Sequence, residues 1–199
     1  MSLLIRDENL IELIQQGEFS LGGEDFSGFD FRGVTFVGLT LTNCNFSNCD
    51  FTNSDLRLVD FSNCDFRNSD MHGANLQEAN LSSCNLQDVD MVGVNLSNAT
   101  LRNADLSQSD LTGSCLNGAN LEGAVLYLTW LSNASLKDVN FSGAKLVETR
   151  LDGVGKIEMD SFFSQNVGFT EITFGEEPIL PPKYSEIARN KAIARYGLI

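Results

Sequence analysis

A five-residue period dominates the middle of this 199-residue chain. From Leu21 to Leu151, every fifth residue is Leu, Phe or Met without insertion or deletion, which gives 27 consecutive positions. This period matches neither the 3.6 residues of a helical turn nor the two-residue alternation of a strand. The stretch is therefore expected to fold as a repeat architecture, in which each unit packs against its neighbours.

The remaining positions of the repeat have preferences of their own. Two residues before the large apolar residue the side chain is small in 23 of 27 repeats, and Asp or Asn precedes it directly in 17 of 27. Residues two apart in an extended segment point the same way, so the small and large apolar side chains should both point inward. Gly or Asn stands two residues after the large residue in 19 of 27 repeats, and both tolerate the positive φ of a type II turn.

Residues 104–113, which read ADLSQSDLTG, match the consensus of Ala, Asp or Asn, Leu and two free residues. The chain thus resembles the pentapeptide repeat family, in its uninterrupted bacterial and cyanobacterial type. The resemblance implies an all-β solenoid, a right-handed quadrilateral β-helix of 20 residues per coil. Between six and seven coils should form a rod roughly 32 Å long.

Short caps are expected at both ends of this solenoid. Residues 1–19 are expected to form an N-terminal capping helix, and residues 20–154 the β-solenoid. For residues 155–177 two alternatives stay open: a degraded coil after an insertion, with Ile157, Phe162, Val167 and Ile172 shifted by one residue, or a cap with a helical turn. Residues 178–199 are expected to form a Pro-rich linker and a basic tail.

The net charge of −14 argues against direct binding to nucleic acid or to an anionic membrane. The N-terminus lacks an apolar stretch of signal-peptide length, and no run approaches a membrane span, so a cytoplasmic location is expected. The sole histidine, His72, should face solvent, and no catalytic, phosphate-binding or zinc-binding spacing occurs. We therefore expect no enzyme, no cofactor and no metal site.

The five cysteines are expected to be structural. Cys44, Cys49, Cys64 and Cys84 occupy the small inward position, whereas Cys115 precedes a large apolar residue and should face outward. Stacked inward side chains point in parallel rather than at each other, which disfavours disulfides. Free buried cysteine packs like a small hydrophobic residue.

An acidic ladder is expected along one face of the rod. Residues 20 apart should stack, which aligns Asp30, Asp50, Asp70, Asp90 and Asp110, followed by Trp130 and Arg150. Two interpretations stay open: the carboxylates satisfy turn amides, or they present an anionic surface. Repulsion between stacked carboxylates would raise their pKa values.

An apolar cluster should lie at the end of this ladder. Tyr127, Leu128 and Trp130 occupy positions that are usually Ser, Asn or Asp, so they should project outward within one coil, with Val125 beside them. An exposed cluster that includes the sole Trp is a candidate hot spot for a protein partner. A second candidate contact, for a homodimer, is the apolar stretch within residues 157–174.

The sequence therefore predicts a non-enzymatic interaction module with an acidic face and an aromatic patch. By resemblance, the alternative is a DNA mimic that binds a type II topoisomerase such as gyrase. Residues 21–151 carry 16 acidic and 7 basic side chains, a net charge of −9. Duplex DNA of the same length carries roughly 19 charges, which places the DNA mimic second.

Overall fold

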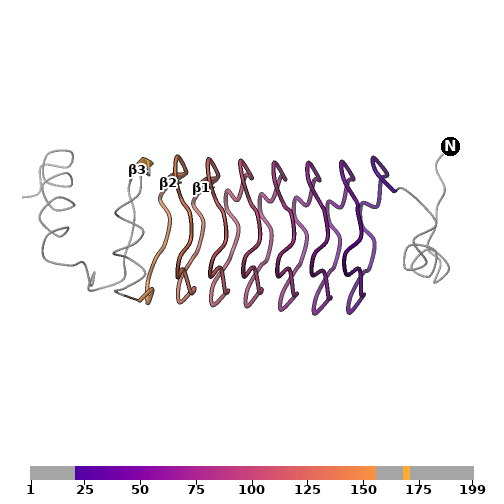
Figure 1. The fold of residues 1–199 in the computed structure, drawn as a ribbon, viewed down its shortest axis with the longest axis horizontal. Helices are drawn as coiled ribbons and strands as arrows, with labels where there is room; N and C mark the ends of the chain where they lie inside the picture. Colours follow the sequence, from indigo (N-terminus) through magenta and orange to yellow (C-terminus); the bar gives the residue numbers. More distant parts are fainter. Residues whose placement is uncertain (1–20, 156–167, 171–199) are drawn as a thin grey trace, which may run out of the picture.

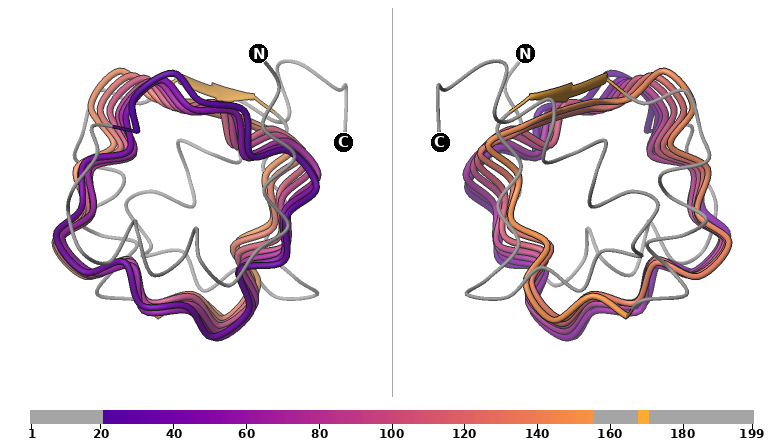
Figure 2. Two further views of the ribbon diagram at one scale, coloured as in Figure 1. Left: turned by 90° about the vertical axis from the view of Figure 1, so that its right-hand side faces the viewer. Right: turned by 90° about the vertical axis from the view of Figure 1, so that its left-hand side faces the viewer.

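The described part of the chain is a stack of coils, each 20 residues long. The structure is a computed structural model, and it describes residues 21–155 and 168–170. Residues 20 apart form parallel bridges, from Asp25 with Asn45 to Trp130 with Arg150. Each coil therefore holds four five-residue segments. Successive coils superimpose in the view along the axis (Figure 2), and their stack is an elongated rod (Figure 1).

Backbone hydrogen bonds join each coil to the next along the whole rod. The N–H of Phe46 donates to the carbonyl of Asp65 at 2.7 Å, and the N–H of Asp65 donates to the carbonyl of Cys44 at 3.0 Å. The same two bonds recur at most repeats. The described coils contain only short regular strands. These bonds between coils therefore pair backbone N–H and carbonyl groups that would otherwise be buried without a partner.

The turn chemistry expected from the sequence is confirmed. The residue two positions after each large apolar residue has a positive φ in all 27 repeats, between 52° and 83°. Sixteen of these residues are not glycine, and Asn is the most frequent among them. Asn is one of the few residues with a side chain that adopts this conformation at small cost.

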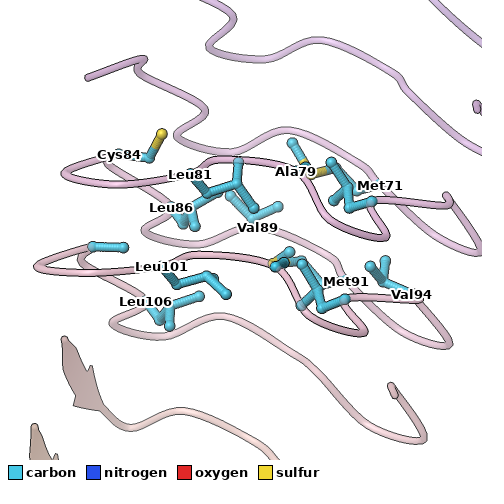
Figure 3. Close-up of a cluster of buried hydrophobic side chains, with 14 of the residues drawn as sticks. Met71, Ala79, Leu81, Cys84, Leu86, Val89, Met91, Val94, Leu101 and Leu106 are labelled. Carbon is cyan, nitrogen blue, oxygen red and sulfur yellow. The ribbon is translucent and has the colours of Figure 1, made fainter. Parts of the chain in front are cut away.

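The large and small inward side chains form one continuous core (Figure 3). In the first coils the core contains columns of phenylalanine rings. Phe26 stacks on Phe46 with ring centroids 5.1 Å apart, and Phe46 stacks on Phe66 at the same distance. Four of the cysteines are buried in this core, Cys115 is partly exposed, and all five are free thiols. The inward and outward positions expected for the cysteines are therefore confirmed.

Regular strands occur only near the C-terminal end of the described coils. β1 (Val125–Tyr127), β2 (Lys145–Val147) and β3 (Gly168–Thr170) form a parallel sheet in the order β1-β2-β3. Leu126 pairs with Leu146, and Leu146 pairs with Phe169. The step from β1 to β2 is thus 20 residues, whereas the step from β2 to β3 is 23.

This pairing corrects one detail of the sequence-based register. A one-residue shift would have aligned Val167 with Leu146, but Phe169 takes that place. The step from β2 to β3 is therefore three residues longer than one 20-residue coil. In this register a large apolar residue, Phe169, again stands opposite Leu146. The expected N-terminal helix, the helical turn before Gly168 and the basic tail all lie outside the described residues.

Candidate interaction site

The aspartates of the acidic ladder stack as expected and also hold their turns in place. Parallel bridges connect Asp30, Asp50, Asp70, Asp90 and Asp110 in sequence, and then Trp130 and Arg150. In each aspartate, Oδ1 accepts a hydrogen bond from the backbone N–H two residues later; for Asp70 the donor is His72, at 2.8 Å. Asparagines such as Asn45 accept the same bond. The ladder carboxylates therefore have a structural role whatever else they do.

Several acidic groups outside or at the start of the ladder are neutralised by arginine. Arg32 lies 2.5 Å from Asp30 and 3.5 Å from Asp50, and Arg57 lies 2.7 Å from Asp55. Within residues 21–155, Asp70, Asp90 and Asp110 have no ion pair of this kind. The unneutralised charge of the ladder is therefore concentrated in the middle of the rod.

The expected rise in pKa is wrong at the first ladder residue. The side-chain hydrogen bond from Arg32, followed by that residue's backbone N–H, lowers the pKa of the Asp30 carboxyl below its usual range. Both interactions favour the charged form, and together they outweigh desolvation, which acts in the opposite direction.

The aromatic patch, defined as Tyr127, Leu128 and Trp130, lies on one coil at the corner between two faces. Tyr127 is 41% exposed, Trp130 is 46% exposed and Leu128 is half-buried. Thr129 between them points inward and donates to the carbonyl of Leu106 at 2.8 Å. The sequence-based placement of these three side chains outside the core is correct.

Arg150 covers part of the patch. Its guanidinium carbon lies 5.2 Å from the centre of the Trp130 ring, which is a cation–π contact. Trp130 thus stands in one column between Asp110 on the preceding coil and Arg150 on the following coil. The guanidinium lies over the indole ring, and Trp130 nevertheless remains exposed.

Sequence reasoning missed three further apolar residues on the surface. Val147 is half-buried and pairs with Tyr127 from the next coil, so it extends the patch. The 20-residue spacing would have revealed it. Val37 and Leu58 are 39% and 55% exposed, and they lie far from the patch along the chain. They show that exposed apolar residues also occur elsewhere on the rod.

The described residues offer little for catalysis or metal binding. His72 is exposed, as expected. In residues 21–155 and 168–170 no group of three or more His, Cys, Asp or Glu could hold a metal ion. Burial raises the pKa of the Cys49 thiol to about 11 and that of Cys84 to about 12. Both thiols are therefore protonated at neutral pH, which suits packing rather than nucleophilic chemistry.

Two protein-family models together match almost all of the repeat region, residues 20–57 and 59–151. One, described as "Pentapeptide repeat region", matches residues 59–151, and the other, described as "Pentapeptide repeats (8 copies)", matches residues 20–57. The chain is a pentapeptide repeat protein. Each five-residue repeat forms one side of a coil, and the residue with positive φ in each repeat makes the turn to the next side. No curated protein matches the sequence significantly.

Solved structures of other pentapeptide repeat proteins are similar to this one. A trypsin-treated variant of QnrB1, a plasmid-mediated fluoroquinolone resistance protein, is 17% identical. That match covers 87% of this chain and 95% of QnrB1, with a TM-score of 0.44. HetL, involved in heterocyst differentiation regulation in the cyanobacterium Nostoc sp. strain PCC 7120, is 19% identical over 82% of this chain and 92% of its own, with a TM-score of 0.35.

A third pentapeptide repeat protein comes from the thylakoid lumen of Arabidopsis thaliana. It is 24% identical over 64% of this chain and 68% of its own, with a TM-score of 0.26. At these scores the superpositions are no basis for a conclusion about function. In the described part of this pentapeptide repeat protein, no helix is long and apolar enough to cross a membrane.

Proposed function

We propose that this chain, as a right-handed quadrilateral β-helix, is a non-enzymatic protein–protein interaction module. The observation that carries the proposal is the exposure of Tyr127 and Trp130 on a single coil. Asp stands at the place of Trp130 in five other coils and Ser at the place of Tyr127 in three, so the core does not require aromatic residues there. Half-exposed Trp and Tyr side chains are typical anchors of protein interfaces.

Rigidity supports the same function. The backbone beneath the patch is fixed by hydrogen bonds on both sides, from Gln108 N–H to the Tyr127 carbonyl at 2.7 Å and from Leu128 N–H to the Val147 carbonyl at 2.8 Å. A side chain presented from a rigid frame loses little conformational entropy on binding. The partner is a protein, and the homodimer contact expected within residues 157–174 remains a separate proposal, since only 168–170 of that stretch are described.

The test compares Trp130→Ala with a matched control, Leu58→Ala, which removes an exposed apolar side chain elsewhere. A partner recovered from extracts of the source cells is purified and titrated calorimetrically against each variant. We expect Trp130→Ala to weaken binding by about thirtyfold or more, the cost of truncating a tryptophan anchor, and Leu58→Ala to leave it unchanged. Equal affinity of both variants for the partner would contradict the proposal.

The stacked ladder supports a second candidate, a DNA mimic that binds gyrase. Five carboxylates in one column, three of them without an ion pair among residues 21–155, are the observation in its favour. The charge density is about half that of duplex DNA, and arginines neutralise Asp30, Asp55 and Asp65. We therefore expect no inhibition of gyrase supercoiling at stoichiometric protein. Inhibition that survives Trp130→Ala but is lost when Asp50, Asp70 and Asp90 become Asn would make mimicry the leading function.

A further inference from the structure

Two neighbouring columns of the rod change charge in the same order around the coil that bears the patch. One column runs Asp105, Val125, Lys145, and the other runs Asp110, Trp130, Arg150. Each goes from acid through an apolar side chain to base, over three successive coils. The coils before them carry acidic or neutral residues at these places, with Asp70 and Asp90 leading to Asp110.

In the column Asp110, Trp130, Arg150, the charged residue at each end forms no ion pair within residues 21–155. Asp110 uses Oδ1 to accept the backbone N–H of Thr112 at 2.9 Å, and it has no ion pair within residues 21–155. Arg150 is exposed and contacts the Trp130 ring, and it too forms no ion pair there. Asp110 and Arg150 stand two coils apart, roughly 9.6 Å at the usual strand spacing, with Trp130 between them.

We propose that the partner that occupies this patch is a second copy of the same chain, docked antiparallel. The two-fold axis lies across the rod, in the plane of contact, and passes through the coil of Trp130. Such an axis turns each column against itself in reverse order. Trp130 then meets the partner's Trp130, and Asp110 meets the partner's Arg150, twice over by symmetry.

The neighbouring column at the corner fits the same arrangement. Gln108, Leu128 and Glu148 occupy the turn positions of the three coils in question. The antiparallel axis places Leu128 opposite the partner's Leu128, and Gln108 opposite the partner's Glu148. Apolar side chains thus meet at the centre of the contact, and polar pairs lie on either side of it, the usual arrangement of a protein interface.

A parallel arrangement of two rods is unfavourable on this face. It would place each ladder aspartate opposite its own copy, and carboxylates about 5 Å apart repel each other even in water. The signs of the charges therefore require the two rods to be antiparallel. The axis must pass through the coil of Trp130, because only there does Arg150 of one chain face Asp110 of the other.

The contact made by the described residues is small. Standard interfaces have about 20–30 residues on each side, whereas this one uses a few side chains from three coils. We therefore expect weak, concentration-dependent self-association rather than an obligate dimer. The inference rests on the proposed function, because it names the partner of the same patch.

The test is sedimentation velocity of the full-length chain over a range of concentrations, with charge-swap variants. We expect Asp110→Arg and Arg150→Asp each to weaken self-association at least about tenfold, since like charges then face each other. Mixed in equal amounts, the two variants should associate with each other about as well as the wild-type chain does, because every facing pair is again opposite in sign. Trp130→Ala should also abolish self-association.

Asp70→Arg is the matched control, since it loses an equivalent turn hydrogen bond but lies two coils beyond Asp110. It should leave self-association unchanged, and circular dichroism should show the same fold for all variants. Self-association that persists in both charge-swap variants, or fails to return in their mixture, would overturn the inference. So would a wild-type chain that stays monomeric at every concentration. In any of these cases binding of a different protein to the patch, tested by Trp130→Ala as above, would still support the proposed function.

Discussion

Buried serines in the core differ in whether their hydroxyl groups find a hydrogen-bond partner. Ser69 and Ser109 donate to the carbonyls of Phe66 and Leu106, both at 2.6 Å. Ser54 and Ser114 are equally buried, but their hydroxyl oxygens have no hydrogen-bond partner. A buried hydroxyl without a partner costs free energy, whereas a bonded one is close to neutral or favourable.

We therefore expect Ser54→Ala to raise the free energy of unfolding by about 1 kcal/mol, because it removes an unsatisfied polar group. Alanine fits the site, since Ala74 occupies the equivalent place on the next coil. Ser109→Ala is the matched change and should lower the free energy of unfolding by about 1 kcal/mol. Chemical denaturation measures both. A loss of stability in Ser54→Ala equal to that in Ser109→Ala would show that the Ser54 hydroxyl is satisfied in solution.

At the scale of the single five-residue element, the aspartate before each large apolar residue has two separable properties. Its oxygen accepts the turn amide, and its charge repels the next carboxylate in the column. Asparagine retains the first property and lacks the second, as Asn75 and Asn95 show in another column. Substitution at one ladder position can therefore distinguish structure from charge.

Asp70→Asn should leave the free energy of unfolding unchanged or raise it by up to about 1 kcal/mol, the size of the repulsion removed. Asp70→Ala should lower it by about 0.5–1.5 kcal/mol, because the N–H of His72 loses its acceptor. Thermal or urea unfolding at neutral pH gives both values. If Asn proved as destabilising as Ala, the negative charge itself would be required at this position.

Most of the fold and the location of the patch could be predicted at this element scale. In a strict five-residue period each position has one direction, so the burial of Leu126 and Thr129 and the exposure of Trp130 follow directly from their places in the repeat. The contact of Arg150 with Trp130 could not be predicted, because it depends on the rotamers of two long side chains. The 23-residue step to Phe169 could not be predicted either. Beyond Gly153 several apolar residues compete for the same place, and only strand pairing decides among them.

For the whole molecule, the repeated 20-residue step means that one entire coil is a removable unit. Deletion of residues 81–100 joins Asn80 to Leu101, and every later residue keeps its face and its column. We expect this variant to fold into a rod shorter by roughly 4.8 Å, with lower stability because one coil-to-coil interface is lost. Small-angle scattering measures the length, and denaturation the stability.

Deletion of only three residues, 82–84, is the matched control. It moves Leu86 and every later large apolar residue from the inward centre to the turn position, and it brings Gln87 to an inward place, so it should abolish cooperative unfolding. A 20-residue deletion that fails to fold, with the three-residue deletion no worse, would contradict the modular register.

The hydrogen bonds between coils have a mechanical consequence. They all run along the rod, as between Phe46 and Asp65 or between Leu111 and Trp130, so a pull on the two ends loads them in line rather than in shear. Bonds loaded in this way break a few at a time, and each coil that peels off releases about 70 Å of extended chain. The protein is therefore stiff against bending across its faces but gives way in small, equal steps under tension along its axis.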